Sequence, residues 1–145
     1  MSSKKTNNWK NIWNKNERLN LIILDCLIKA DGFDSGAGKF NVKDWESYVN
    51  KIYKILEINS EQSIFEVGCG SGAFLYPHYL NKGKVGGIDF SNQLIQIEKN
   101  FMKKSDFKCL DAEDICTSKK YDVCLSNSVF QYFSSYDQAE KIIQI

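Results

Sequence analysis

The apolar positions of the N-terminal third follow a helical spacing in two segments. In the first segment they recur three and four residues apart, at Leu19, Ile22, Ile23, Cys26, Leu27 and Ala30. In the second segment the same spacing is kept by Trp45, Tyr48, Val49, Ile52, Tyr53 and Leu56. This spacing places apolar side chains on one face of a helix. We therefore predict two amphipathic helices, joined by a glycine-rich loop over residues 31–39.

After residue 57 short apolar runs alternate with helix-like segments. The runs lie at residues 63–67, 85–89, 107–110 and 121–126, and the helix-like segments lie at residues 73–81, 92–103 and 135–145. Strands that alternate with helices are typical of βαβ units, in which the strands are parallel and the crossovers right-handed. The pattern predicts the α/β fold class, with a parallel sheet of about four strands flanked by helices.

The same pattern divides the chain into three parts. Residues 1–17 are polar and basic without a sustained period, which predicts a disordered or loosely docked arm. Residues 18–43 hold the first helix and the glycine-rich loop. Residues 44–145 carry the second helix and all of the predicted strands.

Composition and charge narrow the classes of function. A chain of 145 residues, 43% hydrophobic and 26% charged, is expected to bury a single core. The net charge is +1 and Arg18 is the only arginine, so the bidentate phosphate contacts of nucleic-acid binding are nearly missing. No apolar run approaches the roughly 20 residues of a membrane span, and the polar start lacks a signal-peptide core. We expect a cytoplasmic protein with neither a nucleic-acid nor a membrane partner.

The cysteines and the histidine argue against a metal centre. The five cysteines form an odd set without a CxxC pair, which disfavours a disulfide framework and a structural zinc site. The single histidine, His78, leaves little room for a histidine-based metal site or a catalytic triad. We predict reduced cysteines, no metal, and a His78 that is packed or exposed rather than catalytic.

A glycine-rich turn carries the main chemical signal. The segment IFEVGCGSGAF at residues 64–74 ends a strand, turns and opens a helix. Gly68, Gly70 and Gly72 lack Cβ atoms, so a ligand can lie against the backbone there. With Ala73 the segment also satisfies the GxGxxA dinucleotide fingerprint, so the glycines alone do not choose between cofactors.

Glu66 favours a cationic cofactor. Dinucleotide-binding strands normally carry an apolar residue two positions ahead of the first glycine, and a carboxylate there would repel a pyrophosphate. The same carboxylate would attract an ammonium group. The structural alternative is a Glu66 that forms an ion pair with a lysine.

Two further strand ends carry acidic residues. Asp89 ends the second strand, where a carboxylate can accept hydrogen bonds from both hydroxyls of a ribose, and Phe90 can lie flat against an adenine. After the third strand, Asp111 can accept the adenine amino hydrogens while the backbone N–H of Ala112 meets a ring nitrogen. The alternatives are a helix cap for Asp89, a core position for Phe90 and a solvated acidic turn around Asp111.

These residues, at these spacings and in this order, resemble the class I S-adenosylmethionine-dependent methyltransferases, and specifically their small-molecule branch. The matching segments are FEVGCGSG at 65–72, GIDFS at 87–91, DAEDI at 111–115 and YDVCLSNSVFQYF at 121–133. The resemblance covers the chain from about residue 44 onward. It implies a Rossmann-like parallel sheet, S-adenosyl-L-methionine as the cofactor and S-adenosyl-L-homocysteine as the product.

The resemblance also implies roles for individual residues. Glu66 would act on the methionine ammonium group, and the turn over residues 68–72 would hold the methionine part. Asp89 would bind the ribose hydroxyls, and Phe90 would cover one face of the adenine.

After the third and fourth strands, the resemblance assigns four more residues. Asp111 and Ala112 would recognise the adenine edge. Asn127 and Ser128 fall where this family lines the methionine end and the methyl-transfer position. The sequence at this point lacks the Asn/Asp-Pro-Pro-aromatic motif that is usual for methylation of adenine amino groups or side-chain amides. A small-molecule acceptor is therefore expected, and no catalytic residue is assigned.

The segment before residue 44 occupies the place where small-molecule members build a substrate lid. Phe33, Phe40 and Trp45 could line such a lid, or they could be ordinary loop and core aromatics.

The C-terminal part departs from the family pattern. The family's sheet has seven strands, and this chain supplies four before it ends in an apolar helix, so we expect a truncated, incomplete form of that fold. Cofactor binding with weak or absent turnover would follow. The fourth strand would leave an open sheet edge, and we expect self-association through it.

Two other functions stay open at this point. A non-catalytic, methyltransferase-like binding module would explain the small number of strands. A nicotinamide-dependent oxidoreductase would use Gly68, Gly70, Ala73 and Asp89, but Glu66 disfavours it.

Overall fold

The computed structural model describes residues 7–116 and 119–144 of the chain. The elements follow one another along the chain as α1 (Asn7–Ala30), α2 (Val42–Ile55), β1 (Ile64–Val67), α3 (Tyr76–Leu80), β2 (Val85–Asp89), α4 (Asn92–Phe101), β3 (Asp106–Cys109), η1 (Ala112–Asp114), β4 (Val123–Leu125), η2 (Phe130–Tyr132) and α5 (Tyr136–Ile143). Among the described residues, no helix is long and apolar enough to cross a membrane.

The four strands form one parallel sheet in the order β3-β2-β1-β4. The chain runs outward from β1 through β2 to β3 and then returns to place β4 on the other side of β1. This order creates a point between β1 and β4 where the direction of winding reverses. Ligands of open α/β sheets bind at the carboxyl ends of the strands beside such a point. The predicted α/β class and parallel four-stranded sheet are confirmed.

Both faces of the sheet are covered by helices. Successive side chains of each strand point to opposite faces, so each face has its own core. One face packs against α1, α2, α3 and α4 through a core that includes Ile64, Val85, Phe107, Leu27, Val49, Leu75 and Ile95. The other face packs against α5 through a smaller core of Phe65, Val67, Ile88 and Ile142. Strands β1 and β2 are buried over their whole length, as expected for central strands of a parallel sheet.

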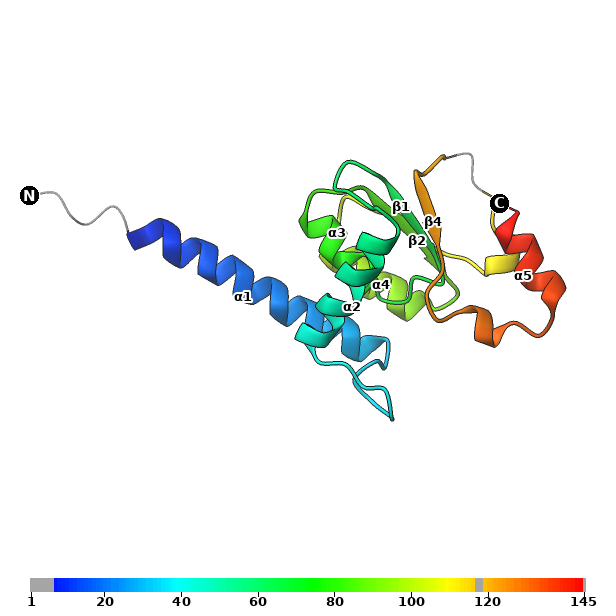
Figure 1. Ribbon diagram of the computed structural model, residues 1–145, viewed down its shortest axis with the longest axis horizontal. Helices are drawn as coiled ribbons and strands as arrows, with labels where there is room; N and C mark the ends of the chain where they lie inside the picture. Colours follow the sequence, from blue (N-terminus) through cyan, green and yellow to red (C-terminus); the bar gives the residue numbers. More distant parts are fainter. Residues whose placement is uncertain (1–6, 117–118, 145) are drawn as a thin grey trace, which may run out of the picture.

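The first helix differs from its prediction in length and in its buried face. It begins at Asn7, so residues 7–17 of the predicted arm are helical, whereas residues 1–6 lie outside the described residues. Its buried side chains are Leu24, Leu27 and Ile28, whereas Leu19 and Ile22 are more than half exposed. The reason is that only the C-terminal half of α1 contacts the sheet domain, while its N-terminal half extends away from it (Figure 1).

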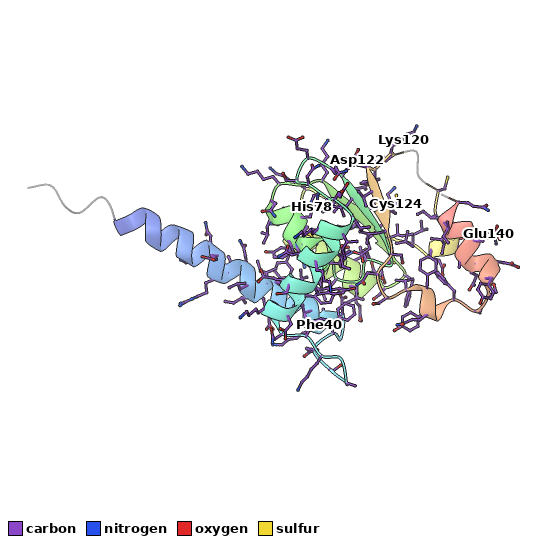
Figure 2. The ribbon with its side chains drawn as sticks, in the orientation of Figure 1. Phe40, His78, Lys120, Asp122, Cys124 and Glu140 are labelled. Carbon is purple, nitrogen blue, oxygen red and sulfur yellow. The ribbon has the colours of Figure 1, made fainter. Side chains whose placement is uncertain are left out.

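The start of β4 is fixed to the start of β1 by a side chain. The Asp122 carboxylate accepts hydrogen bonds from the backbone N–H of Ser63 at 2.7 Å and from its hydroxyl at 2.8 Å. Figure 2 labels Cys124, which lies on this outer strand, and Asp122, which directly precedes it. Cys124 is exposed, in contrast to the buried residues of β1.

Candidate functional site

A cavity of about 770 Å³ lies at the carboxyl ends of the strands. The residues that line it come from the C-terminal end of α1 and from the segments that follow β1, β2, β3 and β4. Ten of the predicted site residues line this cavity: Phe33, Glu66, Gly68, Gly70, Asp89, Phe90, Asp111, Ala112, Asn127 and Ser128. The predicted site residues that do not line it are Gly72, Phe40 and Trp45.

The glycine turn is held against the end of β2. The backbone N–H groups of Gly68 and Cys69 donate to the Ile88 carbonyl oxygen at 2.8 and 3.0 Å. Gly72 has a different task from the predicted one, because it faces the protein core. A Cβ atom on Gly72 would lie 2.3 Å from the Met102 Cε, and its φ of 84° belongs to the left-handed region. Gly72 is therefore required for packing rather than for ligand contact.

Glu66 is the most unusual polar side chain of the cavity. It is 2% exposed, and its Oε2 atom has no hydrogen-bond partner among the described residues. Burial raises the pKa of Glu66 well above its ordinary value, and the neighbouring carboxyl groups of Glu98, Asp31 and Asp89 raise it further. The predicted structural alternative, an ion pair with a lysine, is absent from the described residues. An ammonium group at Oε2 would supply the missing donor and the opposite charge.

Asp89 is fixed by two backbone amides. Its Oδ2 atom accepts from the N–H of Gly70 at 2.9 Å, and its Oδ1 atom accepts from the N–H of Ser91 at 2.8 Å. Each carboxylate oxygen retains capacity for one more hydrogen bond, so a pair of hydroxyls could bind without moving the side chain. Capping of α4 falls to Ser91, whose hydroxyl accepts from the N–H of Leu94.

Phe90 and Asp111 stand at the edge of the same cavity. Phe90 is 80% exposed, so the core position considered for it is wrong. The Asp111 Oδ1 atom accepts from the N–H of Glu113 at 3.0 Å and thereby caps η1. The second oxygen of Asp111 is available to accept a hydrogen bond from a ligand.

Asn127 and Ser128 follow β4 on the opposite side of the cavity. The Asn127 Oδ1 atom accepts a hydrogen bond from the Tyr48 hydroxyl at 2.8 Å, which ties this segment to α2. Ser128 has a φ of 61°, an uncommon value for a residue other than glycine.

The three aromatic residues proposed for a substrate lid divide into two groups. Phe33 lines the cavity and stacks on Trp45 with a centroid distance of 4.7 Å. Trp45 is 1% exposed, and its Nε1–H donates to the Ala73 carbonyl oxygen at 2.9 Å. Phe40, labelled in Figure 2, packs edge-on against Trp45. Trp45 therefore packs between Phe33 and Phe40, and neither Trp45 nor Phe40 lines the cavity.

Asp31 lines the cavity but escaped the sequence reasoning, which placed it in a glycine-rich loop. It immediately follows α1, and its Oδ1 atom accepts from the N–H of Ser71 in the glycine turn at 2.7 Å. Burial raises the pKa of Asp31 to about 6, although the hydrogen bonds from Ser71 oppose the rise. The signal that could have found it is an acidic residue directly after a helix whose last turns are apolar.

Glu98 and Cys69 form a second unforeseen feature, beneath the turn. Glu98 is fully buried on α4, and its Oε2 atom accepts a hydrogen bond from the Cys69 thiol at 3.4 Å. Burial raises the pKa of Glu98 to about 9, so this side chain is neutral at pH 7.

His78 lies outside the cavity. Its side chain is buried, with the Nε2 atom 2.7 Å from the Gln62 carbonyl oxygen. Within residues 7–116 and 119–144, no group of histidine, cysteine, aspartate and glutamate side chains is arranged to hold a metal ion.

Comparison with known proteins identifies a family that the chain matches. The family model described as a methyltransferase domain matches residues 58–144. The chain is 29% identical over 108 residues to a malonyl-[acyl-carrier protein] O-methyltransferase of Acetivibrio thermocellus, a match that covers 65% of this chain and 38% of that protein. The chain spans about a third of the length of the relatives with this name.

Solved structures share the fold at low sequence identity. A sugar N-methyltransferase from a Streptoalloteichus species superimposes with a TM-score of 0.60 at 17% identity, over 70% of this chain and 42% of that one. A methyltransferase from Thiobacillus denitrificans, solved with S-adenosyl-L-homocysteine, superimposes with a TM-score of 0.56 at 18% identity, over 68% of this chain and 43% of that one. Both likenesses show the same sheet architecture.

Proposed function

This chain belongs to the methyltransferase-domain family, and on that premise we propose that it binds S-adenosyl-L-methionine and presents the methyl group to a small-molecule acceptor. The observation that carries the proposal is the buried, unpartnered Oε2 atom of Glu66 in the cavity at the strand ends. A buried carboxylate without a donor is costly unless a ligand supplies one. The cofactor has an ammonium group that meets this need.

The other cavity residues fit the rest of the cofactor. Asp89 is held with both oxygens able to accept ribose hydroxyls, and the exposed ring of Phe90 offers a flat apolar surface to an adenine. Asp111, with one oxygen engaged in its cap, can accept the adenine amino hydrogens. The volume of about 770 Å³ falls in the usual range for small-ligand sites.

The chain's own contribution to the reaction is alignment. The cofactor supplies a sulfonium, a good leaving group, so methyl transfer is an in-line displacement by the acceptor. Glu66 and the turn fix one end of the ligand, and Asp89 fixes its middle. The Tyr48–Asn127 hydrogen bond fixes the backbone at the side from which an acceptor would approach. The closely packed turn keeps water away from Glu66.

The acceptor is proposed to be a small molecule. A single arginine in the chain and the absence of lysine and arginine from the described cavity lining both disfavour a nucleic acid. The relatives named for methylation of malonyl-[acyl-carrier protein] support a small acceptor group. A non-catalytic binding module is the alternative. Radiolabelled methyl transfer across a metabolite panel separates the two, since a module would bind the cofactor and label nothing.

The proposal extends to assembly and location. Strand β4 pairs with β1 on one side, and its other side is unpaired among the described strands. Pairing with a second copy would satisfy that edge, and light scattering at micromolar concentrations would then report a dimer. The described cysteines are all free, which supports a reducing compartment such as the cytoplasm.

The test of cofactor binding is calorimetry with S-adenosyl-L-homocysteine on the wild type and on Glu66→Gln. We expect the wild type to bind and Glu66→Gln to bind roughly 10- to 100-fold more weakly, the usual range for loss of a charged hydrogen bond. Glu61→Gln, at an exposed position three residues before β1, is the matched control and should bind as the wild type does. Absence of binding to folded wild-type protein, or displacement of the ligand by NADH, would contradict the proposal.

A further inference from the structure

Asp31 brings a second carboxyl group to the part of the cavity that contains Glu66. Its Oδ1 atom accepts from the Ser71 N–H at 2.7 Å, and a Cβ atom built on Gly70 would lie 2.5 Å from the same oxygen. The carboxyl group thus rests directly on the glycine turn. Its charge is close enough to Glu66 and Glu98 to raise the pKa of both.

The Ser71 hydroxyl proton can be donated to either of two oxygen atoms, and this affects the hydrogen bond that Asp31 makes. The Ser71 hydroxyl lies 2.8 Å from the Leu27 carbonyl oxygen and 3.0 Å from the Asp31 Oδ2 atom, and it has one proton to donate. When that proton goes to Leu27, the Ser71 oxygen faces Oδ2 and can accept from it. A protonated Asp31 fits that arrangement. An asparagine would fit it as well, since its N–H would replace the acid proton.

The titratable groups that face Asp31 are all acidic: Glu66 comes from β1, Asp89 from β2 and Glu98 from α4, and the Cys69 thiol donates to Glu98. Burial raises the pKa of both Glu66 and Glu98, so Glu98 is neutral at pH 7. No lysine or arginine lines the described cavity. Such a cavity floor favours a cationic ligand over a neutral or anionic one.

We propose that Asp31 is a second binding residue for the ammonium group of the cofactor, supplied by the end of α1 and acting together with Glu66. This inference rests on the proposed function. One cation placed between two carboxyl groups stabilises the ionised form of both. The same contact links the docking of α1 on Ser71 to occupancy of the cavity.

This arrangement predicts that ligand binding releases protons. With a pKa of about 6 in the free protein, Asp31 is partly protonated in mildly acidic solution, and the cation binds its ionised form. Binding therefore releases protons, and affinity rises as the pH is raised through about 6. A ligand without the amino-acid part should show no such dependence on Asp31.

The experiment compares two ligands on matched variants by calorimetry. S-adenosyl-L-homocysteine carries the ammonium group, whereas 5′-methylthioadenosine retains the nucleoside and lacks the amino-acid part. Asp31→Asn removes the charge and keeps the hydrogen bonds to Ser71. Asp34→Asn, on the exposed loop three residues further, is the control for loss of one negative charge.

We expect Asp31→Asn to weaken S-adenosyl-L-homocysteine binding roughly tenfold near neutral pH and to leave 5′-methylthioadenosine binding within about twofold. Equal binding of S-adenosyl-L-homocysteine by Asp31→Asn and the wild type, with Glu66→Gln still weakened, would overturn this inference and leave the proposed function standing. Equal losses for both ligands would also overturn it, since they would reveal a structural role. A wild type that binds neither ligand would overturn both proposals.

A second measurement compares the pH profile of Asp31→Asn, in which Glu66 with its raised pKa still makes binding depend on pH, with that of the wild type. The affinity of the wild type for S-adenosyl-L-homocysteine should rise between about pH 5 and about pH 7.5, with proton release seen as a dependence of the binding heat on buffer. The affinity for 5′-methylthioadenosine should stay constant over that range. Asp31→Asn should show a smaller rise, and an equal rise in Asp31→Asn and the wild type would overturn the inference.

Discussion

The β1–β2 side of the cavity holds its polar side chains in fixed positions, whereas the β4–α5 side follows a partly buried strand and includes an exposed tyrosine ring. On the first side, Glu66 is 2% and Asp89 9% exposed, and Asp89 is bound to two backbone amides. On the second side, Tyr132 is 79% exposed. Strand β4 itself is only partly buried, in contrast to β1 and β2.

The difference indicates a division of labour within one cavity. A ligand that must be aligned to within a fraction of an ångström needs partners whose own positions are fixed by packing and hydrogen bonds, and the first side provides them. The second side has more freedom, as regions with few buried contacts do. We infer that cofactor binding depends on the first side and that the second side adapts to what approaches it.

The largest expected effect comes from two glycine variants that test this contrast. Gly68 and Gly72 both have left-handed φ values, of 74° and 84°, so alanine costs about 1–2 kcal/mol at either position. At Gly72 the new Cβ also meets Met102, which is 1% exposed, and overpacking adds roughly 1–3 kcal/mol. At Gly68 it meets Val129 of the second side, which is only partly buried, so we expect the segment after β4 to shift and to relieve part of the clash.

Gly72→Ala should therefore lower the free energy of unfolding by about 3 kcal/mol, and Gly68→Ala by about half as much. Urea denaturation followed by circular dichroism measures both. A greater loss in Gly68→Ala would mean that the second side is the more rigid one.

The sequence predicts those parts of the two sides that depend on residues close together in the chain, and it does not predict contacts between residues far apart in the chain. Glu66 and Asp89 line the cavity at the strand ends where the sequence predicts them, because their positions near the ends of β1 and β2 follow from the local strand pattern. Asp31 was not predicted, because its partner Ser71 lies 40 residues away, and an acidic residue directly after a helix does not by itself indicate that contact.

The helix α1 shows the same limit. Its apolar positions, including Leu19 and Ile22, satisfy a helical period on more than one face, and periodicity alone does not say which face docks. Contacts with the glycine turn determine which face of α1 is buried, since the Ser71 hydroxyl is hydrogen-bonded to the Leu27 carbonyl oxygen and to Asp31. Likewise, the position of Trp45 in the sequence is compatible with a lid, but its side chain is in the core, where the Nε1–H of Trp45 donates to the Ala73 carbonyl oxygen.

The second expected effect is a pH dependence of stability that comes from the first side. The pKa of Glu98 is raised to about 9 in the folded protein from an ordinary value of 4.5. The folded state thus holds a proton that the unfolded state releases, so stability is highest below pH 4.5 and falls as the pH rises towards 9. One such group contributes a slope of about 1.4 kcal/mol per pH unit, or roughly 2–3 kcal/mol between about pH 6 and about pH 8.

Glu98→Gln should remove the contribution of this one group, while Glu66, whose pKa is raised in the same direction, keeps its own. The matched control is Glu140→Gln on α5, an exposed position on the second side that Figure 2 labels. Urea denaturation at several pH values measures the slope. If Glu140→Gln changed the slope as much as Glu98→Gln, the buried carboxyl group would not be its source.

The smallest expected effect compares one exposed ring from each side. Phe90 follows β2 and Tyr132 ends η2, both rings line the cavity, and they are 80% and 79% exposed. Because neither ring is buried, alanine at either position should leave the unfolding midpoint almost unchanged. Phe90→Ala should weaken S-adenosyl-L-homocysteine binding by about 1 kcal/mol, roughly fivefold, through loss of stacking on the adenine.

Tyr132→Ala should leave that affinity within about twofold, because the second side does not hold the cofactor. Calorimetry measures both affinities, and Phe101→Ala on α4, a partly exposed ring outside the cavity lining, controls for the loss of an aromatic side chain. A larger loss in Tyr132→Ala than in Phe90→Ala would place the adenine on the β4–α5 side. The exposed ring of that side would then belong to the cofactor site, and the contrast between the two sides would no longer hold.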